Sequence, residues 1–170
     1  KGKGKGKSKA CLNRPSTEIV VSGALPFPFP ISLFPSILML TELRVKDLAV
    51  IADVTIPLRA GLNVLTGETG AGKSMLVDAL ALLLGERASG DLVRPGADRA
   101  VVEAVFDIGK DADVARTADE LGVDLGDEGL VVRREISAGG RNRAWANGSP
   151  TTVAALGKLG SFLVDLHGQH

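Results

Sequence analysis

The chain has 170 residues, a length that suits one domain or one domain with a tail. Its 45% apolar and 24% charged residues exclude global disorder, a collagen-like protein and a multi-span membrane protein. A single cysteine, Cys11, excludes an internal disulfide and a cysteine-based metal site, and it favours a reducing compartment.

The zero net charge averages over two unlike segments. Residues 1–38 carry six Lys or Arg side chains and one acid, Glu18, whereas residues 39–170 carry 14 bases and 19 acids. The leader therefore has a net charge of +5 and the body of −5. The leader opens with alternating Lys and Gly, and like-charge repulsion together with backbone freedom predicts that it is disordered.

An apolar stretch over residues 19–40 has the composition of a membrane span or a signal-peptide core. Prolines interrupt it at Pro26, Pro28, Pro30 and Pro35. Each proline removes a backbone donor and breaks a helix, whereas a spanning helix needs about 20 residues. We therefore expect no membrane association.

Met39 has the sequence context of a natural start, so we predict that residues 1–38 are a non-native or non-functional extension. The alternative is a functional basic tail that contacts nucleic acid or acidic lipid non-specifically by neutralising phosphates.

The body begins with strand-like sequence. Alternating apolar and polar residues predict strands at 43–46 and 54–58, on either side of the apolar run 48–51. Residues 62–66 follow a turn and predict a short buried strand. Residues 75–84 are rich in Leu and Ala and predict a helix that ends at Gly85.

The octet before that helix matches the phosphate-loop pattern G-x-x-x-x-G-K-[ST]. It consists of Gly67, Glu68, Thr69, Gly70, Ala71, Gly72, Lys73 and Ser74. Its glycines let the backbone wrap around phosphate oxygens with the N–H groups turned inward, and the positive end of the helix that starts near Lys73 adds to that field. We expect Lys73 to reach the β- and γ-phosphates of ATP and the Ser74 hydroxyl to ligate Mg²⁺. A chance Gly-rich turn is disfavoured because a strand and a helix stand on either side.

The rest of the body mixes strands and helices. The pattern predicts a strand at 101–106, a short helix at 111–121 and a hairpin of strands 130–136 and 141–146. A helix capped by Thr151 or Thr152 is expected to run through Lys158, followed by a buried strand at 162–166. Strands on both sides of one phosphate loop are unlike the strand–helix alternation of a doubly wound kinase.

Arginines cluster on the predicted hairpin at Arg133, Arg134, Arg141 and Arg143. They are placed to follow a DNA backbone, but charges that protect an edge strand from aggregation are the commoner explanation.

Residues 39–170 resemble the beginning of the RecN family, bacterial DNA repair ATPases that are related to SMC proteins within the ABC-type ATPases. The matching segments, in order, are 40–51, 61–66 before the octet, 84–88, 132–136, 142–148 and 167–170. This ordered set is much narrower than a phosphate loop alone. The resemblance implies an α/β P-loop NTPase fold, in which residues 39–170 form the N-terminal lobe of an ABC/SMC-like head with a mixed parallel and antiparallel sheet, truncated after the Q-loop.

The resemblance also implies roles for two residues outside the octet. Gln169 matches the Q-loop glutamine, which contacts Mg²⁺ and the attacking water, and an amide offers both a donor and an acceptor. A polar turn residue is the alternative, whereas a metal site at His167 and His170 lacks a third ligand. Arg94 lies where SMC-like heads carry an arginine that approaches nucleotide or DNA, although a solvated surface arginine fits equally. Lys73, Gln169 and Arg94 are thus the candidate catalytic residues.

Residues 39–170 contain no Walker B strand, no Ser-Gly-Gly signature and no coiled-coil heptads, which the family places after the Q-loop. We therefore expect this chain to bind ATP and Mg²⁺ without turnover. The resemblance implies that the complete protein is a cytoplasmic, nucleoid-associated ATPase. In it, two heads form a homodimer and couple hydrolysis to DNA during double-strand-break repair. A P-loop phosphotransferase and a basic-tailed nucleic-acid-binding module with a vestigial nucleotide site are the alternatives.

Overall fold

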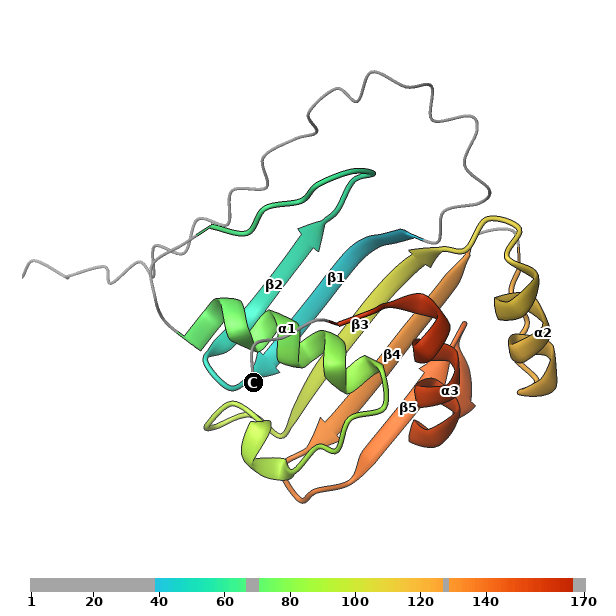
Figure 1. The fold of residues 1–170 in the computed structure, drawn as a ribbon. Coiled ribbons are helices and arrows are strands. Elements are labelled where there is room, and N and C mark those ends of the chain that lie inside the picture. The colour runs from blue at the N-terminus through green and yellow to red at the C-terminus, as the bar shows by residue number, and fades with distance from the viewer. Residues whose placement is uncertain (1–38, 67–70, 127–128, 167–170) are drawn as a thin grey trace, which may run out of the picture.

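The computed structural model describes residues 39–66, 71–126 and 129–166, which form one twisted sheet and the helices that pack on it (Figure 1). The elements in chain order are β1 (Met39–Leu48), β2 (Ile51–Pro57), α1 (Ala71–Leu83), the 3₁₀ helix η2 (Gly90–Leu92), β3 (Arg99–Asp107), α2 (Ala112–Glu120), β4 (Leu130–Ser137), β5 (Asn142–Ala146), β6 (Ser149–Thr151) and α3 (Val153–Leu163). The α/β class expected from the sequence is confirmed.

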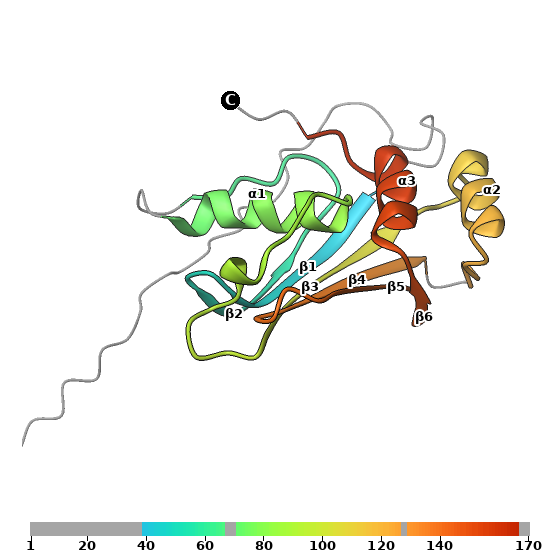
Figure 2. The same ribbon diagram turned by 90° about the horizontal axis from the view of Figure 1, so that it is seen from below.

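The sheet has the strand order β2-β1-β3-β4-β5-β6, and each neighbouring pair is antiparallel. The parallel pairs of the expected mixed sheet do not occur among these six strands. Figure 2 shows that α1 and α3 lie on the same face of the sheet, with α2 packed beside α3. The opposite face carries no helix in the part of the chain that the structure describes.

Alternation along the strands separates these two faces. On β3, Ala100, Val102, Ala104 and Phe106 are buried beneath the helices, whereas Glu103 lies half-buried on the other face. β4 follows the same alternation. An antiparallel sheet commonly packs one face on the core and leaves the other in contact with water, which explains why both strands alternate.

Most local predictions are confirmed. The Asp111 carboxylate accepts hydrogen bonds from the N–H groups of Asp113 and Val114, both at 3.0 Å, and caps α2. The Thr152 hydroxyl accepts from the N–H of Ala155 at 3.0 Å and caps α3, which extends five residues beyond the predicted end at Lys158. The two strands of the hairpin occur as β4 and β5.

The helix of the phosphate loop begins close to the predicted start near Lys73. α1 starts at Ala71, so the last residues of the octet form its first turn and residues 75–83 continue it. The predicted end is confirmed, since Gly85 follows with a φ of +94°, a left-handed conformation that glycine adopts without steric cost.

Two predicted buried strands are wrong. Residues 62–66 form no strand and contain a single β-bridge residue, Leu65, and residues 162–166 divide between the end of α3 and an irregular segment. The side chains of Leu62, Val64 and Phe162 are 62%, 42% and 44% exposed. A short apolar run becomes a strand only where other strands take its backbone hydrogen bonds, and no strand of the described sheet pairs with these runs.

The longest helix of the described residues, α1, has 13 residues, and no helix there has the length and apolarity needed to cross a membrane.

Candidate phosphate-binding site

The described part of the octet forms the first turn of α1. Gly72, Lys73 and Ser74 belong to this turn, whereas residues 67–70 and Gln169 lie outside the described residues. The structure therefore brings Lys73 and Ser74 together at one helix N-terminus, and the remaining loop contacts and the role of Gln169 stay predictions.

The chemistry of this helix end fits a polyphosphate with a divalent cation. No acidic residue occupies the first turn of α1, so nothing there opposes the positive end of the helix dipole. Lys73 is half-buried and Ser74 exposed, which leaves one ammonium and one hydroxyl at the site. Apart from its own helical turn and chain neighbours, a Cβ atom added to Gly72 would meet no atom of the described residues within 4 Å.

One apolar face of α1 holds this helix end in place. Leu76, Ala79, Leu82 and Leu83 are buried against the sheet, whereas Val77 points to the exposed side. Burying a leucine side chain stabilises a fold by about 1.5 to 3 kcal/mol. The packing lays α1 across β1, β3 and β4, with its C-terminal end beside α3 (Figure 1).

Arg94 follows η2 and is joined to the turn between β1 and β2. Its guanidinium donates a hydrogen bond to the carbonyl of Val50 at 2.8 Å, and its backbone N–H donates to the carbonyl of Asp47 at 2.8 Å. The side chain is half-buried rather than fully solvated. Arg94 thus holds its loop to the hairpin, and its approach to nucleotide or DNA stays a prediction.

The structure contradicts the edge-strand explanation for Arg133 and Arg134 and the DNA explanation for Arg134, and contact of the other hairpin arginines with DNA stays a prediction. β4 lies inside the sheet between β3 and β5, so Arg133 and Arg134 do not protect an edge strand. Arg134 faces the helices and is 2% exposed, which prevents it from following a DNA backbone. The alternation of β4 contained this signal, because Arg134 occupies a position in phase with the buried residues Leu130, Val132 and Ile136.

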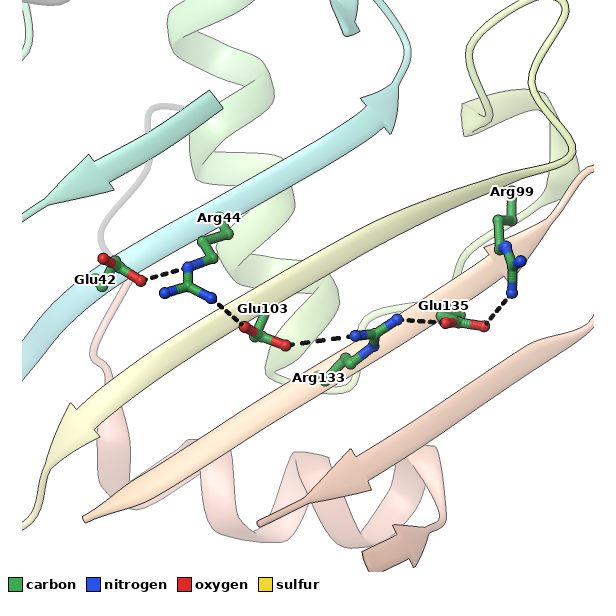
Figure 3. A network of polar contacts seen from close by, with 6 residues as sticks. All are labelled: Glu42, Arg44, Arg99, Glu103, Arg133 and Glu135. Atoms are coloured by element: carbon green, nitrogen blue, oxygen red, sulfur yellow. Dashed lines mark hydrogen bonds and ion pairs between the residues drawn. The ribbon is translucent and has the colours of Figure 1, made fainter. Parts of the chain in front are cut away.

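The helix-free face of the sheet carries a neutral chain of ion pairs across β1, β3 and β4 (Figure 3). Its members alternate in sign, in the order Glu42, Arg44, Glu103, Arg133, Glu135 and Arg99. Arg133 lies 2.6 Å from the Glu135 carboxylate and 3.7 Å from that of Glu103. Three bases and three acids cancel, so DNA phosphates would have to compete with carboxylates for Arg133.

The Glu135 carboxyl has a perturbed pKa. Partial burial alone would raise it, but the hydrogen bond and charge of Arg133, followed by those of Arg99, outweigh burial and hold the pKa below its usual value. Beside the network lies an open hollow of about 900 Å³. Trp145 lines it, and the Arg133 guanidinium lies 5.8 Å from the centre of the Trp145 ring.

The sequence of residues 42–134 matches the protein family described as AAA domain. Because this match covers more than half of the chain, the chain belongs to the AAA domain family. Its fold is similar to that of an SMC ATPase studied for ATP-driven dimerization and DNA-stimulated activation, with a TM-score of 0.57 and 26% identity over 74% of this chain and 80% of that one. The recombination mediator RecF, bound to an ATP analogue, shares the fold alone, with a TM-score of 0.56 at 16% identity over 70% of this chain and 29% of that one.

More particularly, the chain is similar to DNA repair protein RecN, as its motifs indicated. It is 44% identical to RecN of Bacillus subtilis over 132 residues, which are 78% of this chain and 23% of that protein. It is 46% identical to RecN of Streptomyces coelicolor over 127 residues, 75% of this chain and 22% of that protein. The chain thus spans about 23% of the length of these relatives, and they do not favour the phosphotransferase or the vestigial nucleic-acid-binding module.

Proposed function

We propose that residues 39–170 form the first part of an ATP- and Mg²⁺-binding head like that of RecN. In the complete protein this head hydrolyses ATP during recombinational repair of DNA double-strand breaks. The observation that carries the proposal is the 44% identity to RecN over 132 residues, in a chain whose phosphate-loop lysine and serine stand on the first turn of α1.

Each site residue then has a chemical task. The backbone N–H groups of residues 67–72 cradle the phosphates, the Lys73 ammonium neutralises the β- and γ-phosphates, and Ser74 ligates Mg²⁺. Gln169 contacts the metal and the attacking water, and Arg94 approaches the nucleotide or DNA from the loop after η2. Mg²⁺ supplies charge neutralisation at the phosphate oxygens.

The exposed apolar residues support a larger head. Leu62, Val64, Val77 and Phe162 are large and exposed, and they lie in α1, in α3 and in the segment before the octet. Exposed apolar groups gain stability when another surface covers them. We propose that further chain of the same head packs here, and that two heads then form a homodimer around nucleotide and act on DNA. The similar SMC ATPase undergoes ATP-driven dimerization and DNA-stimulated activation. We propose that residues 1–38 stand outside this head.

Nucleotide binding is tested with Lys73→Ala. The substitution removes a charge-assisted contact worth about 1.5 to 3 kcal/mol, so affinity for ATP·Mg²⁺ should fall about tenfold to a hundredfold. A fluorescent ATP analogue titrated in Mg²⁺ measures the change. Lys158→Ala is the matched control, because Lys158 is an exposed lysine that pairs with Glu120 on the surface and should affect affinity little. Equal affinities for Lys73→Ala and the unsubstituted protein would contradict the phosphate-loop assignment.

We propose further that this chain binds ATP without turning it over at an enzymatic rate. Hydrolysis needs a second carboxylate on the Mg²⁺ side and a group that positions water, and residues 39–170 contain no apolar strand that ends in Asp-Glu. Phosphate release over hours, with Lys73→Ala as the contamination control, measures it. Turnover near about 1 s⁻¹ that disappears in Lys73→Ala would refute this expectation.

A further inference from the structure

Arg134 is a buried charge whose hydrogen-bond acceptors are all uncharged. On β4, its Nη1 donates to the carbonyls of Leu82 and Glu86, both at 2.5 Å, and its Nη2 donates to the Asn142 Oδ1 at 3.0 Å. Its Nε has no hydrogen-bond partner among the residues that the structure describes. Burial lowers the pKa of the guanidinium, which is the sign of a charge that has lost water without gaining a counter-charge.

Stability alone does not account for this arginine. An apolar side chain of similar volume in place of a buried ionic group is often neutral or stabilising. The other positions in phase with Arg134 on β4, which are Leu130, Val132 and Ile136, are all apolar.

The two carbonyls that Arg134 binds lie at and just beyond the C-terminal end of α1, because Leu82 belongs to the last turn and Glu86 lies three residues after Leu83. The last carbonyls of a helix lack intrahelical partners and form the negative end of its dipole. α1 has no basic residue in its own last turn, and Arg134 supplies that cation from the sheet below. Asn142 extends the contact along the chain, since its Nδ2 donates to the carbonyl of Ala88 at 3.3 Å.

These hydrogen bonds restrict the position of α1 along its axis more closely than its apolar contacts do. The leucine and alanine contacts of α1 are non-directional and resist sliding along the helix axis only weakly, whereas hydrogen bonds to named carbonyls set an axial position. The helix is about 20 Å long, and Lys73 and Ser74 stand at its opposite end. If the C-terminal end of α1 is held in place, the helix also determines the position of Lys73 and Ser74 at its N-terminal end.

We propose that Arg134, oriented by Asn142, is a positioning residue for nucleotide binding. It sets the axial position of α1 and thereby the place where Lys73 and Ser74 meet the phosphates. This inference rests on the proposed function, because it concerns residues that act on the same nucleotide site through Lys73 and Ser74. The same pair also binds the carbonyls of Glu86 and Ala88 in the segment that leads from α1 toward Arg94, so it holds this segment as well as the end of α1.

The test compares nucleotide affinity among folded variants. Arg134→Met removes both carbonyl contacts, Arg134→Lys keeps the charge without the planar fork, and Asn142→Ala removes only the orienting amide. Arg143→Met is the matched control, an exposed arginine on the neighbouring strand β5. Each protein is titrated with a fluorescent ATP analogue and Mg²⁺ at a temperature at which circular dichroism shows it folded.

We expect Arg134→Met to weaken binding about tenfold or more, Arg134→Lys to recover part of that loss, and Arg143→Met to bind as the unsubstituted protein does. Equal affinity of folded Arg134→Met and unsubstituted protein would overturn the proposal. Should Arg134→Met fail to fold, Asn142→Ala decides, with weakened binding supporting the proposal and unchanged binding overturning it.

Amide hydrogen exchange without nucleotide separates this inference from the proposed function. Positioning predicts that Asn142→Ala loses protection selectively in α1, whereas a merely structural role loses it equally in α1 and β3 and overturns the inference. If the unsubstituted protein binds no nucleotide, the proposed function fails, and the exchange pattern alone decides whether Arg134 and Asn142 position α1.

Discussion

The close approach between α3 and the end of α1 allows a paired test of packing. A Cβ atom added at Gly160 would lie 2.7 Å from the Leu84 Cδ2 and 2.9 Å from the Leu84 Cα. The Cδ2 atom can rotate away, but the Cα atom belongs to the turn that ends α1 and moves only if the backbone moves. At Gly157, in the same helix, an added Cβ would lie 3.4 Å from the Leu84 carbonyl oxygen and 3.8 Å from the Gly85 Cα, which are ordinary contacts.

The two alanine substitutions share one energetic term and differ in the other. Each replaces glycine in the interior of α3, so each gains about 1 kcal/mol of helix propensity. Gly160→Ala also overpacks the contact with Leu84, at a cost of about 1 to 3 kcal/mol. The gain in helix propensity cancels when the unfolding free energies of the two variants are subtracted. The unfolding free energy of Gly157→Ala should therefore exceed that of Gly160→Ala by about 1 to 3 kcal/mol.

Urea unfolding of the 170-residue chain, followed by circular dichroism, measures this difference. A change in midpoint at an unchanged slope reports stability rather than a change in the unfolded state. We expect the midpoint of Gly157→Ala to equal or exceed that of the unsubstituted protein and that of Gly160→Ala to fall below Gly157→Ala. Equal midpoints for the two variants would refute the close packing of α3 on Leu84.

Two further predictions concern acid stability and the leader. The pKa of Glu135 lies below its unfolded value, so its ion pairs stabilise the fold above about pH 4.3 and are lost as the pH falls below that. Glu135→Gln should therefore flatten the fall in urea midpoint between about pH 5 and 3, and an unaltered fall would contradict the ion pairing. Deleting residues 1–38 should leave the melting temperature and nucleotide affinity almost unchanged while it weakens non-specific DNA binding and its salt dependence. A large drop in melting temperature would show that the leader packs on the body.

The sequence by itself determined the features whose signals are local. The octet specifies Lys73 and Ser74 by spacing alone, and α1 carries both residues on its first turn. The alternation of residues 101–106, the helical pattern of residues 111–121 and the expected cap at Thr151 or Thr152 depend on neighbours a few residues away, so they located β3, α2 and α3. In each case the signal lies within the segment itself, either as a local residue pattern or as the apolar–polar alternation along the strand.

Only the tertiary structure decided the features that depend on distant partners. Residues 62–66 have strand-like composition, but a strand needs paired neighbours along its length, and this run has one β-bridge residue, Leu65, and no place among the six strands of the sheet. Arg134 binds carbonyls 48 and 52 residues away, and Arg94 binds one 44 residues away. The local sequence around a charged strand residue is the same whether its side chain faces water or a helix end, because tertiary packing determines its partner.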